Sequence, residues 1–468
     1  MKAKYFSLLM AFSTFSTVSS AQISVKQADK IVQEYIEKEI TDYYWLYSNE
    51  NLEASKSGVT AVLCWSKESI SINNPSFVYF IDEHPYANWE HPCRYLFINK
   101  NNGQISEKKH KIPPANLETW KMITPVPEIK EEKKFDFSKS TINLRSGINT
   151  QNCYAVILSG GMDMSYNYER YWNDCSAIYS TLVNVYGYLK NNIYVLMSDG
   201  TNPANDRNLI NGGYDSSPLD LNGDGVSDIQ YAATKNNIKS VFNILSNILT
   251  PNDYLFIFTT DHGGTTSSGE ATLNLWNETI TASEFAVEIN KVNAGQINIV
   301  MEQCYSGGFI PYLAKQGRVI ATACSSTQLS YAMSSLVYNE FVYYWTAAAA
   351  RFTPSGSSVN ADSNNDGYIS VKEAFDYAKM NDTKPEAPQY NSTKNHLGNY
   401  LTLRGTQACT TVNFFNQSVN TNQTITNCKI NLQNVTVQNN AKLVLDAIEG
   451  ITINGNFVIQ VGSQLEIR

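Results

Sequence analysis

The chain has 468 residues, of which 43% are hydrophobic and 17% are charged, so it has room for two or three domains with buried cores. Its formal net charge of −8 opposes binding to nucleic acid. Residues 1–21 have the pattern of a secretion signal, in which two lysines precede an apolar run that ends at Ser19, Ser20 and Ala21. This run is too short to span a bilayer. We therefore expect export, to the periplasm, the cell surface or the medium, without a membrane span.

Export also permits disulfide bonds, and the chain has eight cysteines. Two pairs of cysteines can form disulfide bonds within one predicted unit: Cys64 with Cys93, and Cys409 with Cys428. If one cysteine is a free nucleophile, an odd number remains. Cys324 ends an apolar run, so we expect it to be a buried free thiol.

Residues 22–125 predict a small α+β unit. Val25–Glu39 has helical periodicity behind Ser24 as an N-cap, and strand patterns follow at Gly58–Trp65, Ser76–Ile81 and Tyr95–Ile98. Residues 126–151 form a predicted linker, because a mixed charge run follows several prolines. An exposed linker is a natural site for proteolytic processing.

Residues 152–405 alternate strand and helix patterns, which predicts an α/β domain with a mostly parallel sheet covered on both faces. The strands are expected at Tyr154–Leu158, Ile193–Met197, Tyr254–Phe258, Ile297–Met301 and Val319–Ala323, and the helices at Glu169–Leu189, Lys235–Leu249, Ser283–Val292 and Glu340–Ala350. In residues 406–468, Asn and Thr alternate with Val, Ile and Leu, which predicts an all-β tail with a few turns of a solenoid.

Two of the predicted strands end in polar motifs with catalytic potential. His262 follows the strand that begins at Tyr254, and Cys304 follows the strand that begins at Ile297. Parallel strands bring their carboxyl ends to one edge of a sheet, where ligands bind. A thiolate attacks carbonyl groups, and an imidazole can donate the proton that a leaving amine needs. The sequence therefore predicts a Cys-His dyad.

The motifs Phe258-Thr-Thr-Asp-His-Gly-Gly and Met301-Glu-Gln-Cys-Tyr-Ser-Gly resemble the paired signatures of the legumain-like cysteine peptidases of clan CD. The first predicted strand is followed by Tyr166-Asn-Tyr, which is similar to a turn of that family. The resemblance covers about residues 152–350. It implies a caspase-like three-layer α/β/α domain and a secreted cysteine endopeptidase that acts on proteins or peptides. Residues 22–125 would then be the prodomain of a zymogen, although legumain-like enzymes carry their inhibitory unit at the C-terminus.

The resemblance also implies roles for individual residues. Asn167 helps to hold the catalytic histidine, although its position suits the N-cap of the following helix equally well. The specificity pocket would contain Arg170, Glu302 and Glu340. One extra residue, Glu169, separates the turn from Arg170, which departs from the family pattern. A pocket with both charge signs suits Asn or Asp, whereas a pocket from which Arg170 points away suits a basic residue.

The implied reaction is acyl transfer without a cofactor. Cys304 attacks the carbonyl carbon, the amides of Gly263 and Cys304 stabilise the oxyanion, and His262 protonates the leaving amine. Transfer to an amine in place of water would make the chain a transpeptidase or ligase. The sequence is also compatible with a calcium-braced surface adhesin or binding protein whose peptidase-like domain is inactive, and with a structural secreted protein.

Two loops have the spacing of calcium sites. Residues 362–373 follow the EF-hand-type loop at every ligand position, with Asp362, Asn364, Asp366, the carbonyl of Tyr368, Ser370 and Glu373 as ligands. The second loop lacks the final acid and offers Asp220, Asn222, Asp224, Val226 and Asp228. We expect structural Ca²⁺ in these loops, with no part in the bond-breaking chemistry.

Overall fold

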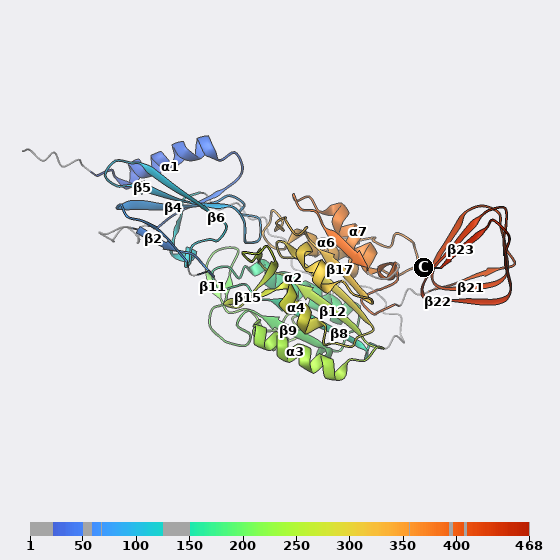
Figure 1. Cartoon of the computed structure of the whole chain (residues 1–468). Helices are drawn as coiled ribbons and strands as arrows, with labels where there is room; N and C mark the ends of the chain where they lie inside the picture. The colour runs from blue at the N-terminus through green and yellow to red at the C-terminus, as the bar shows by residue number, and fades with distance from the viewer. Residues whose placement is uncertain are drawn as a thin grey trace, which may run out of the picture.

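The computed structural model describes residues 22–49, 59–66, 68–124, 150–354, 356–392, 396–406 and 410–467. The predicted signal sequence, most of the predicted linker and Cys409 lie outside these ranges. Figure 1 shows an N-terminal α+β unit, a central α/β unit, and a C-terminal β unit on the side away from the N-terminal one. Within the described ranges, no helix has the length and apolar character needed to cross a bilayer.

The N-terminal unit is an antiparallel sheet, in the order β6-β5-β4-β1-β7, with helix α1 on one face. Ser24 is the N-cap of α1, as the sequence predicts, and it forms a capping box with Gln27. Alternate residues of β4 serve the two faces: Tyr79 packs under α1, and Phe80 packs on the other side. The elements are α1 (Val25–Glu39), β1 (Trp45–Asn49), β2 (Val59–Val62), β3 (Ser69–Ile72), β4 (Ser76–Asp82), β5 (Cys93–Asn99), β6 (Ile105–His110) and β7 (Lys121–Met122).

The central unit is built on a six-stranded sheet in the order β18-β17-β16-β12-β8-β9, in which only β18 pairs antiparallel. The predicted strands are all present, as β8 (Cys153–Ser159), β9 (Ile193–Met197), β12 (Tyr254–Thr259), β16 (Gln296–Met301) and β17 (Arg318–Thr322), and β18 (Gln389–Ser392) joins the edge. Smaller pairings involve β10 (Arg207–Asn208), β11 (Tyr214–Asp215), β13 (Gly263–Thr265), β14 (Ala271–Leu275) and β15 (Glu278–Thr281).

Helices pack against both sets of alternating sheet residues. Phe256 and Phe258 of β12 share a core with α2, α6 and α7, whereas Leu255 and Ile257 share a second core with α3, α4 and α5. These helices are α2 (Glu169–Ser180), α3 (Lys235–Ile248), α4 (Ala282–Ile289), α5 (Ile310–Leu313), α6 (Glu340–Ala350) and α7 (Val371–Asn381). The mixed α/β unit with its largely parallel sheet is consistent with a caspase-like fold.

Local signals set the helix boundaries of the central unit. Thr281 and Glu284 form a capping box at the start of α4. The helix expected over Glu169–Leu189 is shorter, because α2 ends at Ser180 and continues as a π-helical turn over Thr181–Val185. Tyr168, and not Asn167, occupies the N-cap position of α2.

The C-terminal unit is a parallel β arrangement of β19 (Thr411–Phe415), β20 (Ser418–Val419), β21 (Gln423–Val437), β22 (Lys442–Ile459) and β23 (Gln464–Ile467). Equivalent amides stack between neighbouring strands, as in the 3.0 Å hydrogen bond from Asn431 to Asn413. Apolar side chains of β21 and β22 fill the interior. This β-rich unit, with parallel turns stacked on one another, is what the sequence predicts.

The cysteines differ in part from expectation. Cys64 and Cys93 are not bonded to each other, so the pairing considered for them does not form; their sulfur atoms instead donate hydrogen bonds to Asp163 and to the carbonyl of Ile112. Cys324 is free and buried, as predicted. Cys428 is disulfide-bonded, and its predicted partner Cys409 lies outside the described residues.

Candidate active site

The ends of β12 and β16 bring His262 and Cys304 to one edge of the central sheet. These strands are parallel neighbours, with Thr259 paired to Met301, so the residues that follow each strand emerge side by side. Both side chains have no exposed surface. The arrangement predicted from the two motifs is therefore present, but the site is covered.

A segment of the N-terminal unit covers the dyad. The Sγ atom of Cys304 lies 2.8 Å from the carbonyl oxygen of Asn88, and the backbone N–H of Trp89 donates to Nδ1 of His262 at 2.8 Å. The peptide bond between Asn88 and Trp89 therefore lies between the sulfur and the imidazole.

Hydrogen bonds assign the tautomer of His262. Its Nδ1 accepts the N–H of Trp89, so this nitrogen carries no proton, and the Nε2–H donates to the carbonyl oxygen of Tyr166 at 2.9 Å. The backbone of Tyr166 thus orients the ring, as second partners of catalytic imidazoles commonly do. The side chain of Asn167 instead donates to Ser198 Oγ and to the carbonyl of Asp206. Tyr166 therefore orients the histidine, whereas the resemblance assigns this role to Asn167.

Four residues bind the side-chain amide of Asn88, and we call them the amide-binding group: Arg170, Tyr171, Ser330 and Asn339. Arg170 and Tyr171 donate to Oδ1 of Asn88, at 2.8 and 2.7 Å. Its Nδ2 donates to Ser330 Oγ at 2.9 Å and to Asn339 Oδ1 at 3.3 Å. Both ends of the amide are recognised.

Two hydrogen bonds on the side away from Asn88 fix the orientation of the Asn339 side chain. Its Nδ2 donates to Asp174 Oδ2 at 2.7 Å and to Thr260 Oγ1 at 3.0 Å. Its Oδ1 therefore faces the site, where it also accepts from Arg170 Nε at 3.1 Å. The sequence carries no signal for Asn339, because its role depends on contacts with Asp174 of α2 and with Thr260, just after β12, that leave no local pattern.

The two acids expected in the pocket make other contacts. Glu302 is buried and accepts the N–H of Val342 at 3.2 Å. Glu340 accepts from Thr383 and forms an ion pair with Lys384 at 3.3 Å. Of the three predicted pocket residues, Arg170 is the one with a hydrogen bond to Asn88, and Asn339 contacts Asn88 where the resemblance indicates Glu340.

Gly263 allows the backbone of Cys304 to approach closely, and Gly264 does the same for the covering segment. A Cβ atom on Gly263 would lie 2.4 Å from the carbonyl oxygen of Cys304, and one on Gly264 would lie 2.6 Å from the carboxyl group of Glu90. The amide of Gly263, predicted to stabilise the oxyanion, donates here to the carbonyl of Trp89 at 2.7 Å.

Burial keeps both members of the dyad neutral. It raises the pKa of the Cys304 thiol well above its usual value. It also lowers the pKa of the His262 imidazole well below its usual value, and the nearby charge of Arg170 adds to this effect. The covered dyad is therefore a thiol beside a neutral imidazole, and not a thiolate–imidazolium pair.

The first predicted calcium loop is closed by its own hydrogen bonds. Asp362 accepts the N–H groups of Asp366 and Gly367, at 3.1 and 2.9 Å. Glu373 accepts from Ser363 N and, as the capping-box partner at the start of α7, from Ser370 N. The oxygen-only donor set suits Ca²⁺. In the described part of the chain, no group of three or more His, Cys, Asp or Glu is placed to hold a metal.

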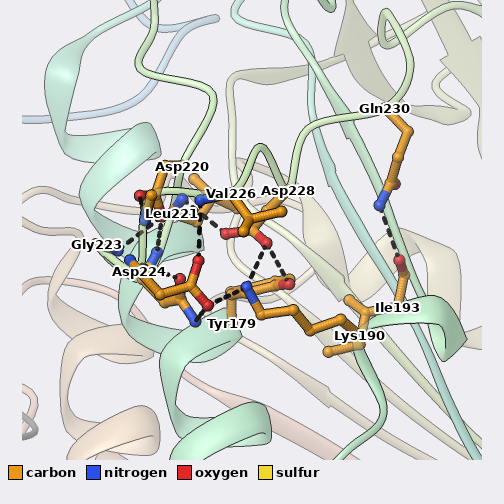
Figure 2. A network of polar contacts seen from close by, with 12 residues as sticks. Tyr179, Lys190, Ile193, Asp220, Leu221, Gly223, Asp224, Val226, Asp228 and Gln230 are labelled. Atoms are coloured by element: carbon orange, nitrogen blue, oxygen red, sulfur yellow. Dashed lines mark hydrogen bonds and ion pairs between the residues drawn. The ribbon is translucent and has the colours of Figure 1, made fainter.

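A lysine from another segment places its ammonium group among the acids of the second predicted calcium loop (Figure 2). Lys190 Nζ contacts the carboxylates of Asp224 and Asp228, the latter at 3.2 Å. Asp228 also accepts from the Tyr179 hydroxyl at 2.6 Å, and Asp220 accepts the N–H of Gly225 at 2.6 Å. An ammonium group therefore already supplies positive charge to this loop.

The comparisons with known proteins bear on the central unit. The model of the peptidase C13 family matches residues 153–397, more than half of the chain. No curated protein matches the sequence. Among solved structures, the chain is similar to a crystal structure of a protein from Geobacter sulfurreducens, with a TM-score of 0.33 and 12% identity over 51% of this chain and 92% of that one.

The matched residues contain both strand ends of the dyad and all four members of the amide-binding group. The family match and the placement of Cys304 beside His262 point to the same chemistry. The chain belongs to the peptidase C13 family, the legumain family of clan CD, and is a cysteine-type peptidase.

Proposed function

We propose that the chain is an exported cysteine endopeptidase that cleaves on the carboxyl side of asparagine. The observation that carries this proposal is the binding of Asn88. Its amide makes four hydrogen bonds to the amide-binding group while its peptide bond lies between Cys304 and His262. A substrate asparagine in the same place would present its own carbonyl carbon to the sulfur.

In the proposed reaction, the thiol proton of Cys304 passes to Nδ1 of His262, and the sulfur bonds to the substrate carbonyl carbon. His262 then protonates the leaving nitrogen as the C–N bond breaks, and water hydrolyses the thioester. The backbone amides of Gly263 and Cys304 are the proposed oxyanion donors. Proton transfer at Nδ1 is favoured because this nitrogen faces the N–H of the residue after asparagine.

The amide-binding group favours asparagine over aspartate. Asn339 offers an acceptor, which suits the NH₂ of asparagine but repels a carboxylate oxygen. Arg170 and Tyr171 still favour the first oxygen of either side chain. For aspartate, the contact with Asn339 is unfavourable and those with Arg170 and Tyr171 are favourable. We therefore expect kcat/KM at neutral pH to be about tenfold lower for aspartate than for asparagine peptides.

The test uses the Asn88→Ala protein, in which the side chain that fills the site is removed. Peptides that differ only before the scissile bond, with Asn, Asp, Gln or Lys, are compared by kcat/KM. We expect asparagine to be preferred, and Cys304→Ala in the same background to abolish turnover. Cys153→Ala, which removes a free thiol at the opposite end of the sheet, is the matched control and should keep it. Cleavage by the Cys304→Ala protein, or a preference for lysine, would contradict the proposal.

A further inference from the structure

We propose that residues 83–92, between β4 and β5, hold the full-length chain inactive by binding its own active site as a substrate would. We call this segment the inhibitory loop. Asn88 occupies the specificity site, and the bond from Asn88 to Trp89 takes the place of the bond to be cleaved. The inference rests on the proposed function, because it identifies the amide-binding group as the site for a substrate asparagine.

The loop binds as an added strand on both sides of the dyad. Before the bond, the N–H of Asn88 donates to the carbonyl of Ser330 at 2.8 Å, and Ala87 pairs antiparallel with Tyr331. After the bond, Trp89 and Glu90 exchange backbone hydrogen bonds with Gly263, at 2.7 and 2.6 Å. Extended peptides that add a strand in this way gain affinity from the backbone and specificity from side chains.

The loop leaves no room for another substrate. Asn88, His262 and Cys304 each have no exposed surface, so a peptide can reach the sulfur only after the loop has moved. The thiol is also held in its neutral, weakly nucleophilic form by the same burial. Occlusion and loss of nucleophilicity therefore have one cause.

The position of Trp89 explains why the loop inhibits and is not simply consumed. Attack by Cys304 would form an S–C bond to Asn88 and break the C–N bond to Trp89, with the thiol proton passing through His262 to the new amine. That amine cannot leave, because the Trp89 indole is 1% exposed and stacks 3.5 Å from the ring of His91. It remains beside the thioester and can attack it, which restores the peptide bond and the thiol.

A second feature slows the forward reaction. Gly263, a proposed oxyanion donor, gives its N–H to the carbonyl of Trp89 in this complex. The negative charge that would develop on the Asn88 oxygen therefore has one fewer donor. Loss of a single oxyanion donor commonly lowers kcat by about a hundredfold or more.

The rest of the N-terminal unit keeps the loop in place. Tyr166 and Met162 of the central unit belong to the same buried core as Phe80 and Trp89. The Tyr166 hydroxyl donates to the carbonyl of Pro114 at 2.6 Å. Because this core is shared, the loop is docked by a folded unit and does not bind alone.

The experiment compares three full-length proteins: the wild type, Asn88→Ala, and Asn102→Ala as a matched control. Asn102 is an exposed asparagine in the β5–β6 turn of the same unit, away from the dyad. Two rates are measured, the turnover of a fluorogenic peptide that ends in asparagine and the alkylation of Cys304 by iodoacetamide, followed by mass spectrometry. We expect Asn88→Ala to raise both rates at least about tenfold, because four hydrogen bonds to the loop are lost. Asn102→Ala should match the wild type.

The two readouts separate the two proposals. Faster alkylation of Asn88→Ala without turnover supports the inhibitory loop and contradicts the asparagine-directed peptidase. Equal turnover by all three proteins, abolished by Cys304→Ala, supports the peptidase and overturns the inhibitory loop. Equal alkylation rates in the wild type and in Asn88→Ala also overturn it.

A second design serves if Asn88→Ala does not fold. A recognition site for a sequence-specific protease is inserted within residues 125–149, and the wild-type chain is cut there. The N-terminal unit then inhibits without a covalent link, so peptide turnover per molecule should rise as the cut protein is diluted. Turnover that does not change with dilution, and equals that of the uncut chain, would overturn the inference.

Discussion

Arg170 is held in one position by aromatic rings and by Asn339. Its guanidinium lies 4.1 Å from the ring centre of Tyr168 and 4.8 Å from that of Tyr171, and its Nε donates to Asn339. Few conformations remain open to it, so little entropy is lost when it binds an amide oxygen. The charge also makes this hydrogen bond stronger than one between neutral groups.

We therefore expect Arg170→Met, in the Asn88→Ala background, to lower kcat/KM for asparagine peptides by about a hundredfold. Methionine keeps much of the packing volume but donates no hydrogen bond. Arg351→Met is the matched control, since Arg351 bonds to the carbonyl of Gly367 at the far end of α6. Unchanged kinetics for Arg170→Met, with a folded protein by circular dichroism, would remove Arg170 from the specificity site.

The sequence predicts some of these residues and not others for a physical reason. His262 and Cys304 follow strands whose apolar patterns are local, so their meeting at one sheet edge can be expected. Asn339 acts through contacts with Asp174 and Thr260 that are distant in sequence. Tyr166 acts through its backbone carbonyl, which every residue type possesses. Neither leaves a pattern in the chain.

At the scale of elements, one side chain of the first loop has two possible roles. Glu373 completes the capping box of α7 with Ser370 and is also the residue expected to bind Ca²⁺ through both oxygens. The calcium site there stays a prediction. Its consequence is measurable as stability, because a ligand that binds only the folded state stabilises that state.

We expect 1 mM CaCl₂ to raise the melting temperature of the Cys304→Ala protein by about 5 °C relative to excess chelator. Asp362→Asn should remove this rise, because it removes a charged ligand at the first loop position. Asp220→Asn, in the loop whose acids already contact Lys190, is the matched control and should retain it. The same melting temperature with calcium and with chelator would reject the site.

The expected elements were largely correct because their signals are short-range. The apolar runs became β8, β9, β12, β16 and β17, and the capping boxes start α1 and α4. The pairing of Cys64 with Cys93 did not form, since membership of one unit does not bring two sulfur atoms together. The path of residues 83–92 had no local signal, because its partners belong to the central unit.

The whole molecule buries several acids around the site. Burial raises the pKa of Asp174 and of Asp261 to about 7, and it raises those of Glu302 and Glu386 well above their usual values. Between pH 4 and 7 the folded chain thus holds protons that the unfolded chain has released. The free energy of unfolding therefore falls as the pH rises through this range. His262 has the opposite effect below about pH 6.5, where the unfolded chain gains a proton.

A single substitution isolates one of these contributions. From pH 5 to pH 8, the Cys304→Ala protein should lose about 3 kcal/mol more stability than Cys304→Ala with Asp174→Asn, because only the first carries a carboxyl group at this position. The effect of His262 cancels in the comparison. Guanidinium unfolding at the two pH values measures it, and Asp376→Asn, at an exposed site, is the control. Equal pH dependence in both proteins would contradict the raised pKa.

Domain order could be predicted from composition, but the docking of the N-terminal unit could not. Its contacts join residues far apart in sequence, such as Asn88 with Ser330 and Tyr166 with Pro114. Neither partner carries a motif for the other. Contacts of this kind arise from the shapes of two folded surfaces, which hydrophobic periodicity does not describe.

Tyr166 contacts both the catalytic histidine and the N-terminal unit. Its carbonyl fixes the tilt of the histidine ring, while its hydroxyl and ring are fastened to the N-terminal unit through Pro114 and Trp65. If the N-terminal unit dissociated, Tyr166 would lose its contacts with Pro114 and Trp65. Its backbone carbonyl, which accepts the Nε2–H of His262, would then be less rigidly held. Removal of the N-terminal unit would therefore change the orientation of His262 as well as expose the dyad.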